Sequence, residues 1–152
     1  MYIVRSMRPW QWTKNLVLFA GVVFARGFYE LVLVKRSVYG FIVFCLLSGA
    51  IYILNDIVDR RRDREHHDKM GRPISAGLLG TAPALVVAIV IILGMMPISW
   101  ALGREFFYLT GAFVLLNLLY SVLLRQIVIL DVFAISFSFL IRAAAGVAVL
   151  HS

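Results

Sequence analysis

Five long apolar blocks constrain this chain of 152 residues more than any other feature. Each block could cross about 30 Å of hydrocarbon as a helix that rises about 1.5 Å per residue. In lipid, only helices and closed barrels satisfy the backbone, and these blocks lack the alternation of barrel strands. The sequence therefore predicts an all-α, multi-pass transmembrane helix bundle with about five spans. They are Leu16–Val34, Val38–Leu54, Ala82–Leu102, Phe106–Leu124 and Ile127–Leu150.

Composition supports a single membrane-embedded unit. Hydrophobic residues make up 62% of the chain and its mean hydropathy is +0.91, whereas a soluble domain is about half apolar. No repeat or low-complexity linker divides the chain, so we expect residues 1–152 to form one transmembrane unit. The first block is the weakest span, because Arg26 and Glu30 interrupt it. Cys45 is the only cysteine, which excludes an intramolecular disulfide.

The distribution of basic residues predicts the orientation of the chain. The third loop holds only Arg104, whereas the loop between the second and third blocks is strongly basic. Its basic residues are Arg60, Arg61, Arg62, Arg64, Lys69 and Arg72. The positive-inside rule places the N-terminus and the Asp56–Gly80 loop in the cytoplasm. We expect an integral, multi-pass protein of the plasma (inner) membrane. The net charge of +7 reflects this topology, and no nucleic-acid-binding signature is present.

Three aspartates lie directly after the second apolar block. Asp56, Asp59 and Asp63 are spaced i, i+3, i+7 and share one face if the helix continues. Neighbouring carboxylates repel one another, and an intramembrane acid costs about 2.5–3.5 kcal/mol on insertion scales. A bound cation would offset both costs, and Mg²⁺ prefers a few carboxylates together with phosphate oxygens. The spacing therefore predicts a Mg²⁺-diphosphate site, with a solvated, charge-balanced loop as the alternative.

Basic and turn-forming residues follow these acids. Lys69 lies just before the turn-forming segment Gly71–Gly77, and Arg72 lies within it. We expect them to hold phosphate oxygens that the metal leaves free. The other arginines of the loop are better explained as anchors near anionic lipid. Farther along, Arg142 lies well inside the last apolar block, where it needs an internal acid, a phosphate or a water-filled cavity.

Several of these motifs resemble one known family. The pattern Asn55-Asp56-x-x-Asp59-x-x-x-Asp63, followed by Arg72–Gly77, resembles the first aspartate-rich motif and loop of the UbiA-type intramembrane prenyltransferase superfamily. The opening Arg8–Asn15 is similar to that of its decaprenyl-phosphate phosphoribosyltransferase branch. The same branch is indicated by Tyr120, Ser121, Arg125, Ile129, Asp131, Val132 and Ile141–Gly146. The resemblance covers nearly the whole chain.

This resemblance implies a larger helix bundle in which two aspartate-rich motifs bind a diphosphate through Mg²⁺. It implies that Asp56, Asp59 and Asp63 are the catalytic metal ligands. The substrate-binding residues would be Lys14, Asn15, Asn55, Lys69, Arg72, Tyr120 and Arg125. The donor would be phosphoribosyl diphosphate and the acceptor a polyprenyl phosphate. On this reading the chain is the N-terminal half of a family member and forms a partial UbiA-type fold. A C-terminal half with the second motif would complete it.

Three other functions remain open at this point. One is an aromatic-acceptor polyprenyltransferase, which would use a prenyl diphosphate donor at the same metal site. Another is a non-catalytic membrane fragment whose acidic face binds a partner or an ion. A third is a transporter subunit in which Asp131 and Arg142 line a path, although acids clustered at one rim favour a diphosphate site over transport.

Overall fold

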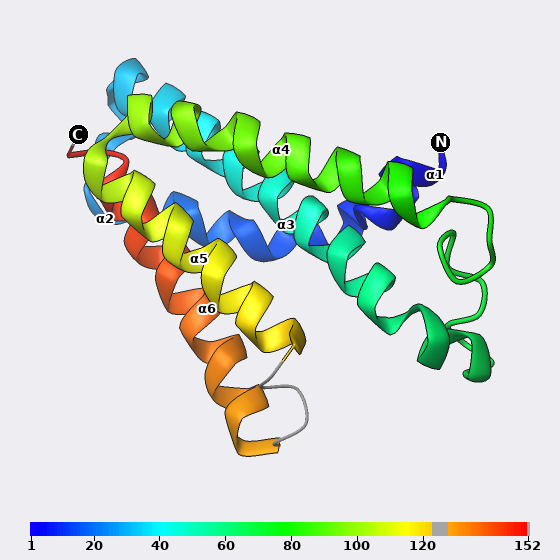
Figure 1. Cartoon of the computed structure of the whole chain (residues 1–152). Coiled ribbons are helices and arrows are strands. Elements are labelled where there is room, and N and C mark those ends of the chain that lie inside the picture. Colours follow the sequence, from blue (N-terminus) through cyan, green and yellow to red (C-terminus); the bar gives the residue numbers. More distant parts are fainter. Residues whose placement is uncertain (123–127, 152) are drawn as a thin grey trace.

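The computed structural model describes residues 1–122 and 128–151, and this described part contains helices and no strand (Figure 1). The chain begins with the short helix α1 (Tyr2–Ser6), and the first apolar segment forms the 3₁₀ helix η1 (Pro9–Phe19) and helix α2 (Ala20–Phe24). The remaining elements are η2 (Gly27–Tyr29), α3 (Leu31–Glu65), α4 (Thr81–Leu102), α5 (Arg104–Val122) and α6 (Val128–Ala148). The predicted all-α fold class is confirmed.

Two of the described helices, α3 and α4, are long and apolar enough to cross a membrane. Helix α3 extends beyond the predicted block Val38–Leu54 at both ends, so the three acids continue the same helix. Helix α4 begins one residue before its predicted block and ends with it. The described parts of α5 and α6 fall close to the fourth and fifth blocks, whose junction at residues 123–127 lies outside the described residues.

The prediction of a first span over Leu16–Val34 is wrong. Helix α2 ends at Phe24, and Leu31 already begins α3, which runs back along the molecule (Figure 1). Arg26 lies between them with a φ of 52°, in the left-handed region that interrupts an α-helix. The two charges that weakened the predicted span, Arg26 and Glu30, are exposed at this reversal. Local charge therefore outweighed the length of the apolar run.

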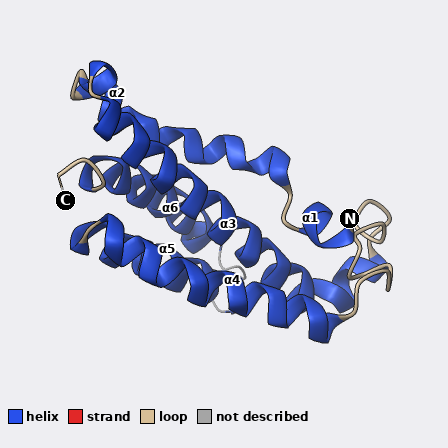
Figure 2. Ribbon diagram, turned by 90° about the horizontal axis from the view of Figure 1, so that it is seen from above, coloured by secondary structure: helices blue, strands red, loops and turns tan. Residues whose placement is uncertain are grey.

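Helix α3 is the centre of the bundle. Its apolar window is 61% buried, whereas that of α4 is 11% buried, so α4 presents most of its apolar surface outward. Helix α4 packs along α3, and α6 packs against both α5 and η1 (Figures 1 and 2). One hydrophobic cluster surrounds Phe44, Phe106 and Phe113, and a second surrounds Ile53 and Ile74. The second cluster lies under the loop that follows α3.

Small residues and one arginine hold the bundle together away from the acids. A Cβ atom added to Gly146 in α6 would lie 2.1 Å from the carbonyl oxygen of Leu18, so η1 crosses α6 with backbones nearly in contact. Arg36 donates hydrogen bonds to the carbonyls of Leu102 and Val149, at the ends of α4 and α6. Figure 2 places the N-terminus and the loop over residues 66–80 together, at the end of the molecule opposite the C-terminus.

Candidate functional site

The three aspartates of α3 are all buried. Their exposed fractions are 1% for Asp56, 6% for Asp59 and 2% for Asp63, although the segment that carries them is highly charged. At 100° per residue the three positions lie on one side of the helix, which explains why they are buried together. The alternative of a solvated, charge-balanced loop is therefore wrong for these residues.

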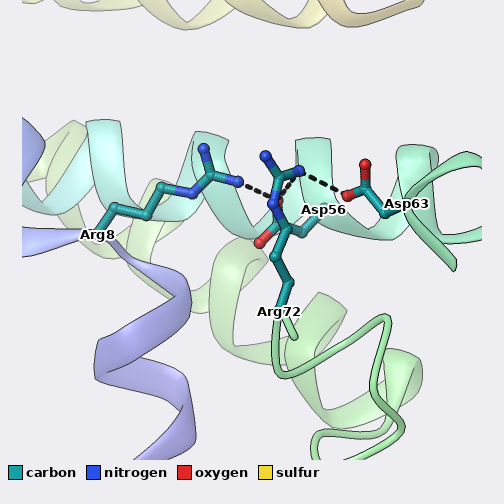
Figure 3. Close-up of polar contacts among 4 residues, drawn as sticks. All are labelled: Arg8, Asp56, Asp63 and Arg72. Carbon is teal, nitrogen blue, oxygen red and sulfur yellow. Dashed lines mark hydrogen bonds and ion pairs between the residues drawn. The ribbon is translucent and has the colours of Figure 1, made fainter. Parts of the chain in front are cut away.

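Two arginines from other segments meet these carboxylates (Figure 3). Arg8 donates from Nη2 to Asp56 Oδ1 at 2.5 Å. Arg72 donates from Nη1 to the same oxygen at 3.3 Å and to Asp63 Oδ2 at 2.6 Å, so it bridges two of the three acids. The side chains of Asp56 and Asp63 are 2–3% exposed, whereas those of the two arginines are 22% and 25% exposed. The arginines therefore cover these two acids and remain accessible from outside.

Local backbone structure places each arginine. Arg8 has a φ of 51°, in the left-handed region, and separates α1 from η1. The proline that follows, Pro9, disfavours a right-handed helical conformation at Arg8, so the chain turns there. Arg72 opens a compact turn in which its carbonyl accepts from the amide of Ala76 at 2.8 Å. Arg64 of α3 donates to the carbonyl of Ser75 at 3.0 Å and ties this turn to the helix that carries the acids.

Two cavities adjoin this cluster. The first, which we call the carboxylate cavity, has a volume of about 290 Å³ and is lined by Asp56, Asp68, Arg5, Arg8, Trp10, Gly71, Arg72 and Pro73. The second, which we call the bundle cavity, has a volume of about 220 Å³ and lies among η1, α3, α5 and α6. Its polar lining residues include Lys14, Asn55, Asn117, Tyr120 and Arg142. Asn55, which lines the bundle cavity, directly precedes Asp56, which lines the carboxylate cavity.

The donor set of this site suits Mg²⁺ held together with a phosphate ligand. Carboxylate oxygens are available from Asp56, Asp59 and Asp63, and the buried Oδ1 atom of Asn55 has no hydrogen-bond partner among the described residues. With Arg72 between Asp56 and Asp63, no group of three or more metal-binding side chains converges in the described part of the chain. Mg²⁺ usually takes one or two carboxylates and completes its shell with water and substrate oxygens. The residues therefore fit a metal that arrives with its diphosphate.

The structure distributes the predicted substrate-binding residues unevenly. Lys14, Asn55 and Tyr120 line the bundle cavity, and Arg72 lines the carboxylate cavity. Lys69 is half-buried and lines neither of the two cavities described here. Arg125 lies outside the described residues. Asn15 is buried and hydrogen-bonded to Arg142, so its assignment as a substrate contact stays a prediction.

Arg8 is the site residue that sequence reasoning missed. It appeared only as the first residue of the Arg8–Asn15 opening, and was not assigned to the site. Its partner Asp56 lies 48 positions away in the sequence, so no helical periodicity connects them. The one local signal was a positive charge directly before a proline, at the predicted cytoplasmic end of the chain.

Comparison with known proteins agrees with this architecture. The chain is 36% identical to the decaprenyl-phosphate phosphoribosyltransferase of Mycolicibacterium smegmatis and 34% identical to that of Mycobacterium tuberculosis. Both alignments cover 95% of the present chain. These alignments cover 46% and 49% of the two relatives, so the chain spans about half the length of the curated relatives it matches.

A solved structure of a UbiA homolog from Archaeoglobus fulgidus, bound to DMAPP and Mg²⁺, superimposes with a TM-score of 0.83. The superposition covers 100% of this chain and 55% of the homolog. Sequence identity is 19%, so this likeness is one of fold alone. The sequence profile of the UbiA prenyltransferase family matches residues 15–152. With nearly the whole length matched, the chain belongs to the UbiA prenyltransferase family.

Proposed function

We propose that the natural full-length protein is a Mg²⁺-dependent transferase that moves a phosphoribosyl group from phosphoribosyl diphosphate to a polyprenyl phosphate. The observation that carries this proposal is the buried trio Asp56, Asp59 and Asp63 beside a cavity, with Arg8 and Arg72 paired to the first and last of them. Membership of the UbiA family and the names of the mycobacterial relatives support the reaction class.

Diphosphate binding would exchange the partners of the two arginines. In the structure described, Arg8 and Arg72 supply the positive charge that the buried carboxylates need. If the carboxylates held Mg²⁺ instead, the guanidinium groups would be free to donate to diphosphate oxygens, for which their fork of N–H donors is well suited. Bound Mg²⁺ would add positive charge against the leaving diphosphate. The same two arginines that pair with Asp56 and Asp63 would thus also hold the diphosphate.

The lining of the bundle cavity favours a polar donor. Lys14, Asn117 and Tyr120 face it together with apolar residues of α3 and α5. A prenyl donor needs mainly an apolar tunnel, whereas a phosphoribosyl donor carries hydroxyl groups and an additional phosphate that require hydrogen-bond donors. The mixed lining suits a sugar phosphate that meets a lipid acceptor.

The protein is expected in the plasma membrane, with the catalytic loop on the cytoplasmic side. The two apolar helices and the family membership indicate an integral membrane protein. The basic residues of the loop favour the cytoplasmic side under the positive-inside rule. The loop and the N-terminus share one end of the bundle, which supports placing both on the same side (Figure 2).

The proposal is tested with membranes that contain the natural full-length protein and labelled donors. Transfer from phosphoribosyl diphosphate to polyprenyl phosphate, weakened by Lys14→Ala, is the expected result. Lys35→Ala is the matched control, because Lys35 is exposed near the other end of α3. Prenylation of an aromatic acid without phosphoribosyl transfer would overturn the proposal in favour of an aromatic prenyltransferase. Failure of both reactions would favour a non-catalytic protein.

A further inference from the structure

Arg142 of α6 is buried where the helix is otherwise apolar. Only 5% of the surface of Arg142 is exposed. The guanidinium donates from Nε to Asn15 Oδ1 at 2.8 Å and from Nη1 to Ser138 Oγ at 2.9 Å. Its central carbon also lies 4.7 Å from the ring centroid of Phe113 and 5.4 Å from that of Phe139. Two hydrogen bonds and two aromatic rings therefore fix the orientation of this cation.

None of these contacts neutralises the charge of Arg142. The ion pairs found among the described residues join Arg8 and Arg72 to Asp56 and Asp63, and none of them includes Arg142. A guanidinium has five N–H donors, of which Asn15 and Ser138 take two. Aromatic rings attract a cation but do not cancel its charge. A buried charge without a counter-ion is costly, so this position favours an anionic ligand.

The bundle cavity gives such a ligand access to Arg142. Arg142 lines it together with Lys14, a second cation, and with Asn117 and Tyr120. Asn55, whose Oδ1 is buried and unpaired among the described residues, lines the same cavity beside the acidic segment. At about 220 Å³ the cavity is smaller than the roughly 300–1,000 Å³ of pockets that hold whole drug-sized ligands. It suits one polar group of a larger substrate.

We propose that Arg142, positioned by Asn15 and Ser138, binds a phosphate group in the bundle cavity without a metal, separately from the diphosphate at Asp56. Arginine presents parallel N–H donors that match two phosphate oxygens. The identity of the phosphate rests on the proposed function. It is either the ribose-linked phosphate of the donor or the phosphate of the lipid acceptor, and both offer the same chemistry to Arg142.

The test measures apparent Kd values for the detergent-purified full-length protein with two ligand pairs. Phosphoribosyl diphosphate is compared with inorganic diphosphate in Mg²⁺, which isolates the ribose-linked phosphate. Farnesyl phosphate is compared with farnesol in EDTA, which isolates the acceptor phosphate. In one of the pairs, Arg142→Gln should weaken binding of the phosphate-bearing member by about 10- to 100-fold, as for loss of a charge-assisted hydrogen bond. Inorganic diphosphate and farnesol should bind as they do to the wild type.

Asn15→Asp separates phosphate binding from a packing role. It keeps an oxygen acceptor for Arg142 Nε but places a carboxylate against the guanidinium, so it should also weaken the phosphate-bearing ligand about 10-fold or more. This variant remains informative if Arg142→Gln fails to fold. Ser136→Ala is the control, because Ser136 lies on the exposed side of the same helix.

Two results would overturn the proposal. One is an Asn15→Asp protein that binds all four ligands with wild-type affinity, which would make Arg142 a packing residue. The other is an equal loss of affinity for inorganic diphosphate, which would show that Arg142 belongs to the diphosphate site at Asp56. Failure of phosphoribosyl transfer in the membrane assay would count against the proposed function alone, because an Arg142-dependent preference for farnesyl phosphate would still establish the subsite.

Discussion

Replacing Gly146 by alanine should separate η1 from α6 and destabilise the bundle. The added Cβ would lie 2.1 Å from the carbonyl oxygen of Leu18, and ordinary contact begins at 3.4 Å, so the backbones must part by about 1.3 Å (3.4 minus 2.1). Overpacking of a tight interior costs about 1–3 kcal/mol. Because backbone atoms cannot turn aside as a side chain can, we expect a loss near the upper end of that range. The shift should also stretch the 2.8 Å hydrogen bond between Arg142 and Asn15, which lie about one turn before the crossing on their own helices.

The assay is thermal unfolding of the detergent-purified protein, followed by loss of the monodisperse peak on size-exclusion chromatography. Gly111→Ala is the matched control, because no atom lies within 4 Å of a Cβ added at this position in α5. Alanine there should stabilise the helix by about 0.5–1 kcal/mol relative to glycine. An apparent Tm for Gly146→Ala equal to that of Gly111→Ala would refute the reasoning, because it would show that the close crossing does not exist.

Three further predictions concern other parts of the molecule. A cysteine at the exposed position 76, made by Ala76→Cys in a Cys45→Ser background, should resist impermeant thiol reagents in intact cells but react after the cells are permeabilised, because the basic loop is expected in the cytoplasm; ready labelling from outside would contradict this topology. Arg36→Gln should lower the apparent Tm, because it removes charged hydrogen bonds to the ends of two helices, each worth about 1.5–3 kcal/mol; an unchanged Tm would show that water replaces them. Arg72→Gln should weaken diphosphate binding about 10-fold or more in Mg²⁺, as for loss of one charge-assisted hydrogen bond, and calorimetric titration would show an unchanged Kd if Arg72 served the loop alone.

Periodicity and hydropathy predicted the parts of the fold that depend on neighbours in the sequence. The helix that carries Asp56, Asp59 and Asp63 was expected from an apolar run that leads straight into the acids, and their i, i+3, i+7 spacing predicted that they would share one side. The position of α4 followed from its unbroken apolar run. Because these features arise within a single helix, the spacing of residue types was sufficient to predict them.

Contacts between segments that are distant in the sequence could not be predicted from periodicity and hydropathy. The pairing of Arg8 with Asp56 depends on a turn at Arg8 and on how η1 crosses the bundle. Hydropathy joined Leu16–Val34 into one span, because a window average outweighs the single left-handed residue Arg26. Arg142 was recognised as a cation in need of a partner, but its neutral partner Asn15 lies 127 positions away. Tertiary packing determined each of these outcomes.

The central claim is that Asp56 and its neighbours bind a metal only together with a diphosphate ligand, and thermal stabilisation of the full-length protein tests it most directly. Its apparent Tm should rise when Mg²⁺ and phosphoribosyl diphosphate are both present and stay unchanged with either one alone, because Arg72 bridges two of the carboxylates and Mg²⁺ needs substrate oxygens to complete its shell. The double variant Asp56→Ala, Asp59→Ala should lose this stabilisation. Equal stabilisation of the double variant, or full stabilisation of the wild type by Mg²⁺ alone, would contradict the account.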